Sequence, residues 1–177
     1  CETFRVRGEY DFKPLQQQTN FRLGADGVGT VVATGPNVDT LTKGDAVAFV
    51  GAAFAEYTTN PAKMVWKIPS ASAEYVGLRI SALTSLAMLE VTGAIAPGQT
   101  VLITAAAGGA GHFAVQIAKL KGCTVIGTCG SESKAEFLKK VCRCDHVINY
   151  KTTPTNVKAE LQRLAPNGLD VVLEGVG

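Results

Sequence analysis

Residues 105–111 read AAAGGAG and supply the residue types that a phosphate-binding turn requires. Gly108, Gly109, Ala110 and Gly111 stand between an apolar run, QTVLITA, and a segment of helical periodicity, GHFAVQIAKLKG. Glycines at a strand-to-helix turn let backbone N–H groups approach a diphosphate, and the helix N-terminus behind them favours an anion. The alternative is a tight turn that needs small residues and binds nothing. Because a second strand-and-helix unit follows, the pattern favours dinucleotide binding.

The second predicted strand, CTVIGTC, ends without the acidic residue that usually bonds the ribose hydroxyls of NAD. Gly130 and Ser131 occupy that position, and Lys134 follows within one helical turn. An acid would repel a ribose phosphate, whereas an ammonium group and a hydroxyl bind one, so the sequence predicts NADPH as the cofactor. Taken alone, Lys134 would be an ordinary solvated helix lysine. Tyr150, after the next strand, is equally a phosphate-pocket residue or an ordinary strand-end tyrosine.

A parallel sheet is needed to position these residues. Apolar runs alternate with helical segments after Pro97, which gives strands at 99–105, 123–129, 145–150 and 169–176 and helices at 111–122, 131–141 and 156–164. Ser131 is the expected N-cap of the middle helix, and Gly122 the expected end of the first. Apolar strands alternating with helices indicate an α/β fold, a Rossmann-type parallel sheet that is incomplete at about four strands.

The chain has a different character before residue 73. Short β-rich runs, VGTVVATG, DAVAFVG and FAEYTT, are separated by the turn-forming GPN, KGD and NPA. They predict part of a small β domain over residues 1–72, in which 1–20 show no clean period and stay unassigned. Residues 74–93 carry apolar side chains at helical spacing and predict a helix that opens the second domain, residues 73–177.

The composition argues against several classes of protein. Hydrophobic residues make up 46% of the 177 residues and charged residues 18%, which is enough apolar material for a core. The net charge of +2 is scattered, so we expect no dedicated nucleic-acid surface, and no apolar run reaches membrane-spanning length. The five cysteines include no C-x-x-C pair, which favours buried, reduced thiols over a zinc site. We expect a cytoplasmic protein, with the peroxisome and the mitochondrion as alternatives.

Four motifs in order, AAAGGAGHFAVQIAK, VIGTCGSESKAEFLK, DHVINYK and DVVLEGVG, resemble the medium-chain dehydrogenase/reductase superfamily. Within it they are most similar to the zinc-independent quinone oxidoreductases, and among these to the prostaglandin reductases. GADGVGTVVATG, KGDAVAF, FAEYTT and ALTSLAMLE agree with the family's GroES-like domain and its linking helix. The resemblance covers residues 21–177. It implies NADPH bound between two domains, reduction of an enone or a quinone by hydride transfer, and a homodimer at full length.

The resemblance also assigns roles to single residues. The pyrophosphate turn matches Gly108, Gly109, Ala110 and Gly111; the ribose-phosphate pocket matches Gly130, Ser131, Lys134 and Tyr150; Gly175 and Thr84 match positions near the nicotinamide. The zinc alcohol dehydrogenases have Gly-His-Glu where this chain has Gly24-Ala25-Asp26, so no metal is expected. No catalytic residue is assigned, and Tyr57 is expected to be a core or interface tyrosine rather than a proton donor.

Two other interpretations stay open. Relatives of this fold also serve as crystallins or bind RNA, so a non-catalytic NADPH-binding protein is one alternative. The other is an inactive fragment, because the resemblance stops after the fourth predicted strand and the chain looks like a truncated piece of a longer enzyme. An incomplete sheet would leave a strand edge uncovered.

Overall fold

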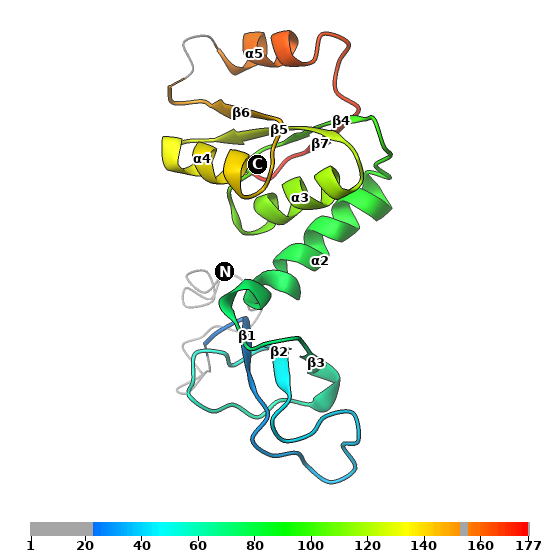
Figure 1. The fold of residues 1–177 in the computed structure, drawn as a ribbon, viewed down its shortest axis with the longest axis vertical. Helices are drawn as coiled ribbons and strands as arrows, with labels where there is room; N and C mark the ends of the chain where they lie inside the picture. Colours follow the sequence, from blue (N-terminus) through cyan, green and yellow to red (C-terminus); the bar gives the residue numbers. More distant parts are fainter. Residues whose placement is uncertain (1–22, 153–155, 177) are drawn as a thin grey trace, which may run out of the picture. The chain divides into compact units, whose positions relative to one another are not determined.

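The computed structural model describes residues 23–152 and 156–176, and the chain divides into two compact units between Ile80 and Ser81 (Figure 1). The unassigned residues 1–20 lie outside the described part. Each unit has its own sheet and its own core. Among the described residues, no helix has the length and the apolar character that crossing a membrane would require.

The first unit contains a three-stranded antiparallel sheet. Its order is β1-β2-β3, with β1 Asp26–Thr30, β2 Ala46–Val50 and β3 Val65–Lys67. Two 3-10 helices follow the second and third strands, η2 at Ala62–Met64 and η3 at Ala73–Leu78. A small core of Leu41, Val47 and Phe49 packs against neighbours that include Val65.

The strand predicted at FAEYTT is wrong. Residues 54–59 form no strand, and β3 pairs with β2 instead, with Val47 opposite Lys67. Val65 supplies the apolar contact that a strand at this edge needs, whereas the side chains of Phe54 and Tyr57 are both 71% exposed. Of the two roles expected for Tyr57, the core role is therefore wrong, and the interface role stays a prediction.

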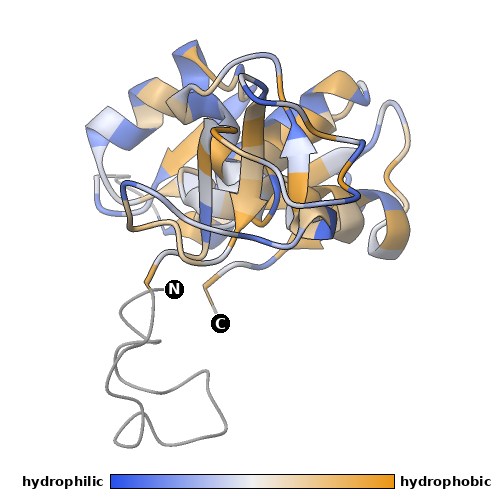
Figure 2. Cartoon of the chain, turned by 90° about the horizontal axis from the view of Figure 1, so that it is seen from below, coloured by the Kyte–Doolittle hydropathy of each residue, from blue (hydrophilic) through white to orange (hydrophobic). Residues whose placement is uncertain are grey.

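The second unit confirms the predicted α/β class. Its four strands are parallel and lie in the order β6-β5-β4-β7, with β4 Thr100–Ile103, β5 Thr124–Cys129, β6 His146–Asn149 and β7 Val171–Leu173. Helices α3 Gly109–Leu120 and α4 Glu132–Lys140 cover one face, and α5 Val157–Leu164 covers the other (Figure 1). In Figure 2 these helices carry both orange and blue stretches, as amphipathic helices do.

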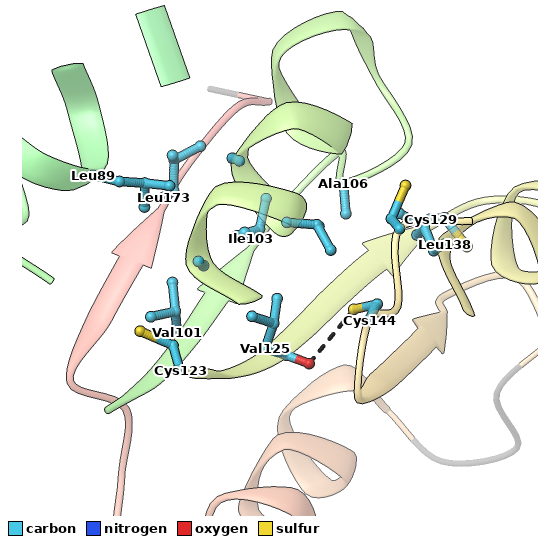
Figure 3. Close-up of a cluster of buried hydrophobic side chains, with 14 of the residues drawn as sticks. Leu89, Val101, Ile103, Ala106, Cys123, Val125, Cys129, Leu138, Cys144 and Leu173 are labelled. Carbon is cyan, nitrogen blue, oxygen red and sulfur yellow. Dashed lines mark hydrogen bonds between the residues drawn. The ribbon is translucent and has the colours of Figure 1, made fainter. Parts of the chain in front are cut away.

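Alternation along the strands builds a core on each face of this sheet. Val101, Ile103 and Val125 pack with α3 and α4, whereas Leu102 and Ile126 face α5. Figure 3 shows the larger core, in which aliphatic side chains and thiols interleave. Its labelled members are Leu89, Val101, Ile103, Ala106, Cys123, Val125, Cys129, Leu138, Cys144 and Leu173.

The buried thiols confirm the cysteine prediction for the described residues. Cys123, Cys129, Cys142 and Cys144 are all free and buried. The Sγ atom of Cys144 lies 3.5 Å from the carbonyl oxygen of Val125, the dashed line in Figure 3. Burial raises the pKa of the Cys144 thiol to about 11, so this thiol stays protonated at neutral pH.

The helix predicted over residues 74–93 is divided in three. The 3-10 helix η3 ends at Leu78, α2 spans Ser81–Leu86, and a π-helical segment, η4, continues over Ala87–Thr92. The break between η3 and α2 coincides with the boundary between the units. Ser85 on α2 and Leu89 on η4 are buried in the second unit, where Ser85 contacts α3 and Leu89 joins the larger core. Packing against these neighbours, rather than the apolar period alone, therefore sets the helix geometry.

Candidate nucleotide-binding site

The predicted site residues gather where the parallel strands end. The chain leaves β4 through α3 toward β5 on one side, and returns on the other side of β4 as β7. A parallel sheet opens at such a point of reversal, and ligands bind in the crevice beyond the carboxyl ends of the strands. The loops after β4, β5, β6 and β7 hold nearly all the residues singled out from the sequence.

The turn after β4 is tight because the helix packs directly on it. A Cβ atom at Gly111 would lie 2.4 Å from the carbonyl oxygen of Ala105 and 2.8 Å from the Cα atom of Ala106. Ala105 itself adopts a left-handed conformation, with φ +45°. Gly111 therefore allows α3 to approach the strand closely, which is what the third glycine of a dinucleotide turn does.

The first turn of α3 presents its backbone donors to the site. Gly108 is the N-cap, and no described side chain caps the helix there. The N–H groups of Gly109, Ala110 and Gly111 consequently have no acceptor within the helix, and the helix dipole adds positive potential at the same place. The four predicted residues 108–111 thus lie in one turn, in which the N–H groups of Gly109, Ala110 and Gly111 are the donors that could bind an anion.

Hydrogen bonds fix this turn to the rest of the unit. The N–H of Thr104 donates to the carbonyl oxygen of Leu173, and that of Ala106 donates to Thr128, both at 3.0 Å. The buried hydroxyl of Ser85 lies 2.8 Å from the carbonyl oxygen of Ala110, which ties α2 to α3. Sequence reasoning missed Ser85, and a lone serine in a helical run gives no signal that could have identified it.

The end of β5 brings Gly130 and Tyr150 together. A Cβ atom at Gly130 would lie 2.5 Å from the hydroxyl oxygen of Tyr150, so the phenol rests on the glycine. The next residue, Ser131, is the N-cap of α4, as predicted, and accepts a hydrogen bond from the N–H of Lys134 at 3.4 Å. The side chain of Lys134 is exposed and makes no hydrogen bond or ion pair with the described residues.

The residues that follow β7 also lie at the carboxyl edge of the sheet, where they hydrogen-bond to Thr104. The N–H of Gly175 donates to the Oγ1 atom of Thr104 at 2.7 Å, and that hydroxyl donates to the Glu174 carboxylate at 2.8 Å. Gly175 therefore lies beside the glycine turn, as expected for one site. Thr104 and Glu174 were missed, although each directly follows a predicted apolar strand, which is the signal that could have identified them.

Thr84 lies on α2, next to the buried Ser85, with its own side chain exposed. Among the described residues, no side-chain hydrogen bond joins Thr84 to another predicted site residue. Within residues 23–152 and 156–176, no three histidine, cysteine or acidic side chains lie together so that they could hold a metal ion.

Two sequence families match the chain. One, described as an alcohol dehydrogenase GroES-like domain, covers residues 2–70, and the other, described as a zinc-binding dehydrogenase, covers residues 109–177. Prostaglandin reductase-3 of Mus musculus is 46% identical over 159 residues, which is 89% of this chain and 41% of that protein. A probable quinone oxidoreductase of Leishmania amazonensis is 46% identical over 174 residues, covering 97% of this chain and 49% of that one.

Solved structures agree with the sequence matches. The quinone oxidoreductase of Escherichia coli, whose structure is a complex with NADPH, superposes with a TM-score of 0.80 at 28% identity, covering 99% of this chain and 54% of that chain. The chain belongs to the medium-chain dehydrogenase/reductase superfamily, in the branch of the quinone oxidoreductases and prostaglandin reductases. It spans about half the length of the relatives it matches.

Proposed function

We propose that the carboxyl edge of the parallel sheet binds NADPH, and that the protein reduces the carbon–carbon double bond of an α,β-unsaturated ketone, or a quinone, without zinc. One observation carries the proposal. At the end of β5, Tyr150 rests on Gly130 where an acidic residue would stand in an NAD site, and the unpaired Lys134 follows. This edge is built for a ribose phosphate rather than for ribose hydroxyls.

The residues fit the cofactor along its length. The turn at 108–111 would hold the diphosphate through the N–H groups of residues 109–111. The Lys134 ammonium with the Ser131 and Tyr150 hydroxyls would hold the ribose phosphate. Gly175, which hydrogen-bonds to Thr104 beside the turn, and Thr84 are assigned to the nicotinamide end. The NADPH complex of the Escherichia coli relative supports this choice of cofactor.

The reaction divides between the cofactor and the chain. When bound, NADPH supplies the hydride that reduces the β-carbon of the enone. The chain's part is to orient the substrate and to stabilise the negative charge that develops on the carbonyl oxygen, through backbone donors or a hydroxyl. A proton then reaches the α-carbon from solvent or from a tyrosine. The names of the two 46% identical relatives support a reductase of this kind.

The proposed function also includes the protein's partners and its location in the cell. We assign a small enone or quinone as substrate, no nucleic-acid partner, and a homodimeric full-length protein in the cytoplasm. The scattered net charge of +2 supports the absence of a nucleic-acid surface.

Titration with NADPH and with NADH, followed by nicotinamide fluorescence, tests the cofactor site. Lys134→Ala should weaken NADPH binding about tenfold, because a charge-assisted bond to phosphate contributes about 1.5 kcal/mol, and should leave NADH binding within about twofold. Lys139→Ala, on the exposed last turn of the same helix, is the matched control and should change neither affinity. Equal loss for both nucleotides in Lys134→Ala would contradict the assignment of this lysine to the ribose phosphate.

Oxidation of NADPH in the presence of enones and quinones tests the activity separately. We expect absorbance loss at the nicotinamide band that depends on the acceptor. Tight NADPH binding with no oxidation by any enone or quinone would instead favour the non-catalytic nucleotide-binding protein.

A further inference from the structure

A histidine lies at the anion-binding turn, and nothing above assigns it a role. His112 is the fourth residue of α3, and its ring is only partly buried. The Nδ1 atom lies 2.8 Å from the carbonyl oxygen of Gly108, which also accepts the backbone N–H of His112 at 3.1 Å. A carbonyl oxygen only accepts, so Nδ1 carries the hydrogen in this bond. Any further proton on the ring therefore enters and leaves at Nε2.

Ring contacts place this imidazole between α3 and α4. Its centroid lies 4.2 Å from that of Phe113 on α3 and 6.0 Å from that of Phe137 on α4. Phe137 is three residues after Lys134, and α4 begins at the end of β5 beside Gly130. The ring thus lies at the turn after β4, on the side of α3 that faces α4.

The charged groups on the elements around the ring carry both signs. The dipole of α3 is positive at its N-terminus, and Lys134 on the first turns of α4 is a cation that makes no ion pair with a described residue. Of the other elements packed on α3, α2 and β4 carry no ionisable group, β5 carries the thiol of Cys129, and η4 carries Glu90, which is paired with Lys121. The remaining ionisable groups of α4 are Glu132, Lys139 and the paired Glu136 and Lys140.

We infer that His112 is a phosphate-responsive binding residue, whose imidazole takes up a proton at Nε2 when a phosphate-bearing nucleotide occupies the turn. This rests on the proposed cofactor site. An anion of charge near −2 beside the ring attracts an added proton, so the nucleotide and the proton stabilise each other. The gain in affinity is complete below the midpoint of the free protein and is lost as pH rises through the midpoint of the complex.

Proton NMR of the imidazole C2 protons tests the inference directly, because the chain has only two histidines. Adenosine 2′,5′-bisphosphate is the probe. We expect it to raise the titration midpoint of His112 by about 0.5 to 1 pH unit, which corresponds to a three- to tenfold gain in affinity. His146 opens β6, at the opposite edge of the sheet, and serves as the internal control whose midpoint stays unchanged. The variant His112→Gln, which retains a side-chain donor, assigns the two resonances.

Calorimetric titration of the same probe at pH 6 and pH 8 gives a second readout. Ionisation of the phosphate itself changes affinity in this range, so the measured quantity is the ratio of native to His112→Gln affinity. The native protein should bind the probe about three to ten times more tightly than His112→Gln at pH 6. At pH 8 the two affinities should agree within about a factor of two. Adenosine 5′-monophosphate lacks the 2′-phosphate and therefore shows which of the two phosphates raises the titration midpoint of His112. A rise caused by either phosphate supports the inference.

Two results would overturn the inference about His112, and they differ in whether the proposed cofactor site remains. Binding of the probe with an unmoved His112 midpoint and a ratio of one at both pH values would leave His112 a structural residue, with the cofactor site intact. Failure of both NADPH and the probe to bind would remove the cofactor site and this inference together.

Discussion

At the scale of single residues, two glycines of the site differ in what surrounds them. The Cβ position of Gly111 is closed by backbone atoms, which cannot move without displacing the turn. The Cβ position of Gly109 has the Oγ atom of Ser81 as its nearest neighbour, at 3.3 Å, and a side chain can turn away. The surrounding backbone therefore requires glycine at position 111, whereas at position 109 the neighbouring side chain can move to admit a Cβ atom.

We predict that Gly111→Ala lowers the free energy of unfolding by about 2–3 kcal/mol, because the added methyl overpacks a rigid contact. Gly109→Ala should change it by less than about 1 kcal/mol, since a relaxed side chain and the better helix propensity of alanine offset each other. Urea unfolding of both variants measures this. Equal losses in the two variants would mean that the close approach of α3 to Ala105 is not what requires Gly111.

The buried thiol of Cys144 predicts a loss of stability in alkaline solution. Desolvation raises its pKa from an ordinary 9.0 to about 11. A raised folded-state value means that the stability is complete below pH 9 and is lost as pH rises toward 11, by roughly 2–3 kcal/mol. Urea unfolding at pH 8 and pH 10.5 should show a larger fall for the native chain than for Cys144→Ala. A parallel fall in both would show that other groups account for it.

At the scale of elements, the site depends on how α2 meets α3. The hydroxyl of Ser85 is fully buried and lies 2.8 Å from the carbonyl oxygens of Ser81 and Ala110. This contact holds the first turn of α3, whose N–H groups form the proposed anion site. Ser85 is a positioning residue in this arrangement, because it acts on the backbone of the turn rather than on a ligand.

We predict that Ser85→Ala costs about 1–2 kcal/mol of stability, the usual range for removing a buried partner. Amide hydrogen exchange should also speed up at the start of α3 more than at its end, which a uniform loss of stability would not produce. Thr92→Ala, an exposed hydroxyl on the neighbouring η4, is the control and should stay within about 0.5 kcal/mol. Unchanged exchange at residues 109–112 in Ser85→Ala would refute the positioning role.

At the scale of the whole molecule, the sheet of the second unit has an uncovered side. Among the described residues β7 pairs only with β4, and the Val172 side chain is 53% exposed. A groove of about 180 Å³ lies beside it, lined by Met88, Leu89, Thr92, Gly93, Val171, Val172, Leu173 and Glu174. An exposed apolar strand edge is a site of association between chains.

We predict that the 177-residue chain self-associates with rising concentration, and that Val172→Lys weakens this by placing a charge on the edge. Sedimentation velocity over a hundredfold range of concentration measures it. Val141→Lys is the matched control, since Val141 is 61% exposed but lies at the end of α4 rather than on a strand edge. A monomer at all concentrations, or equal effects of the two substitutions, would contradict the prediction.

The sequence by itself determined the elements of the second unit and the chemistry of its loops. Apolar runs and caps such as Ser131 and Gly122 are local signals, and the structure places α4 and the end of α3 where they predict. The glycine turn and the neutral end of β5 are equally local. The first unit was predicted less well, because Val65–Lys67 becomes a strand only through pairing with β2, which no short run of sequence encodes.

Only the tertiary structure decided which residues meet. Tyr150 and Gly130 are twenty positions apart and touch because parallel pairing puts the ends of β5 and β6 side by side. Thr104 and Gly175 meet for the same reason at the ends of β4 and β7. Residue types and helical or strand periods are properties of short segments, whereas register between strands and burial against a distant helix arise only when the whole unit packs.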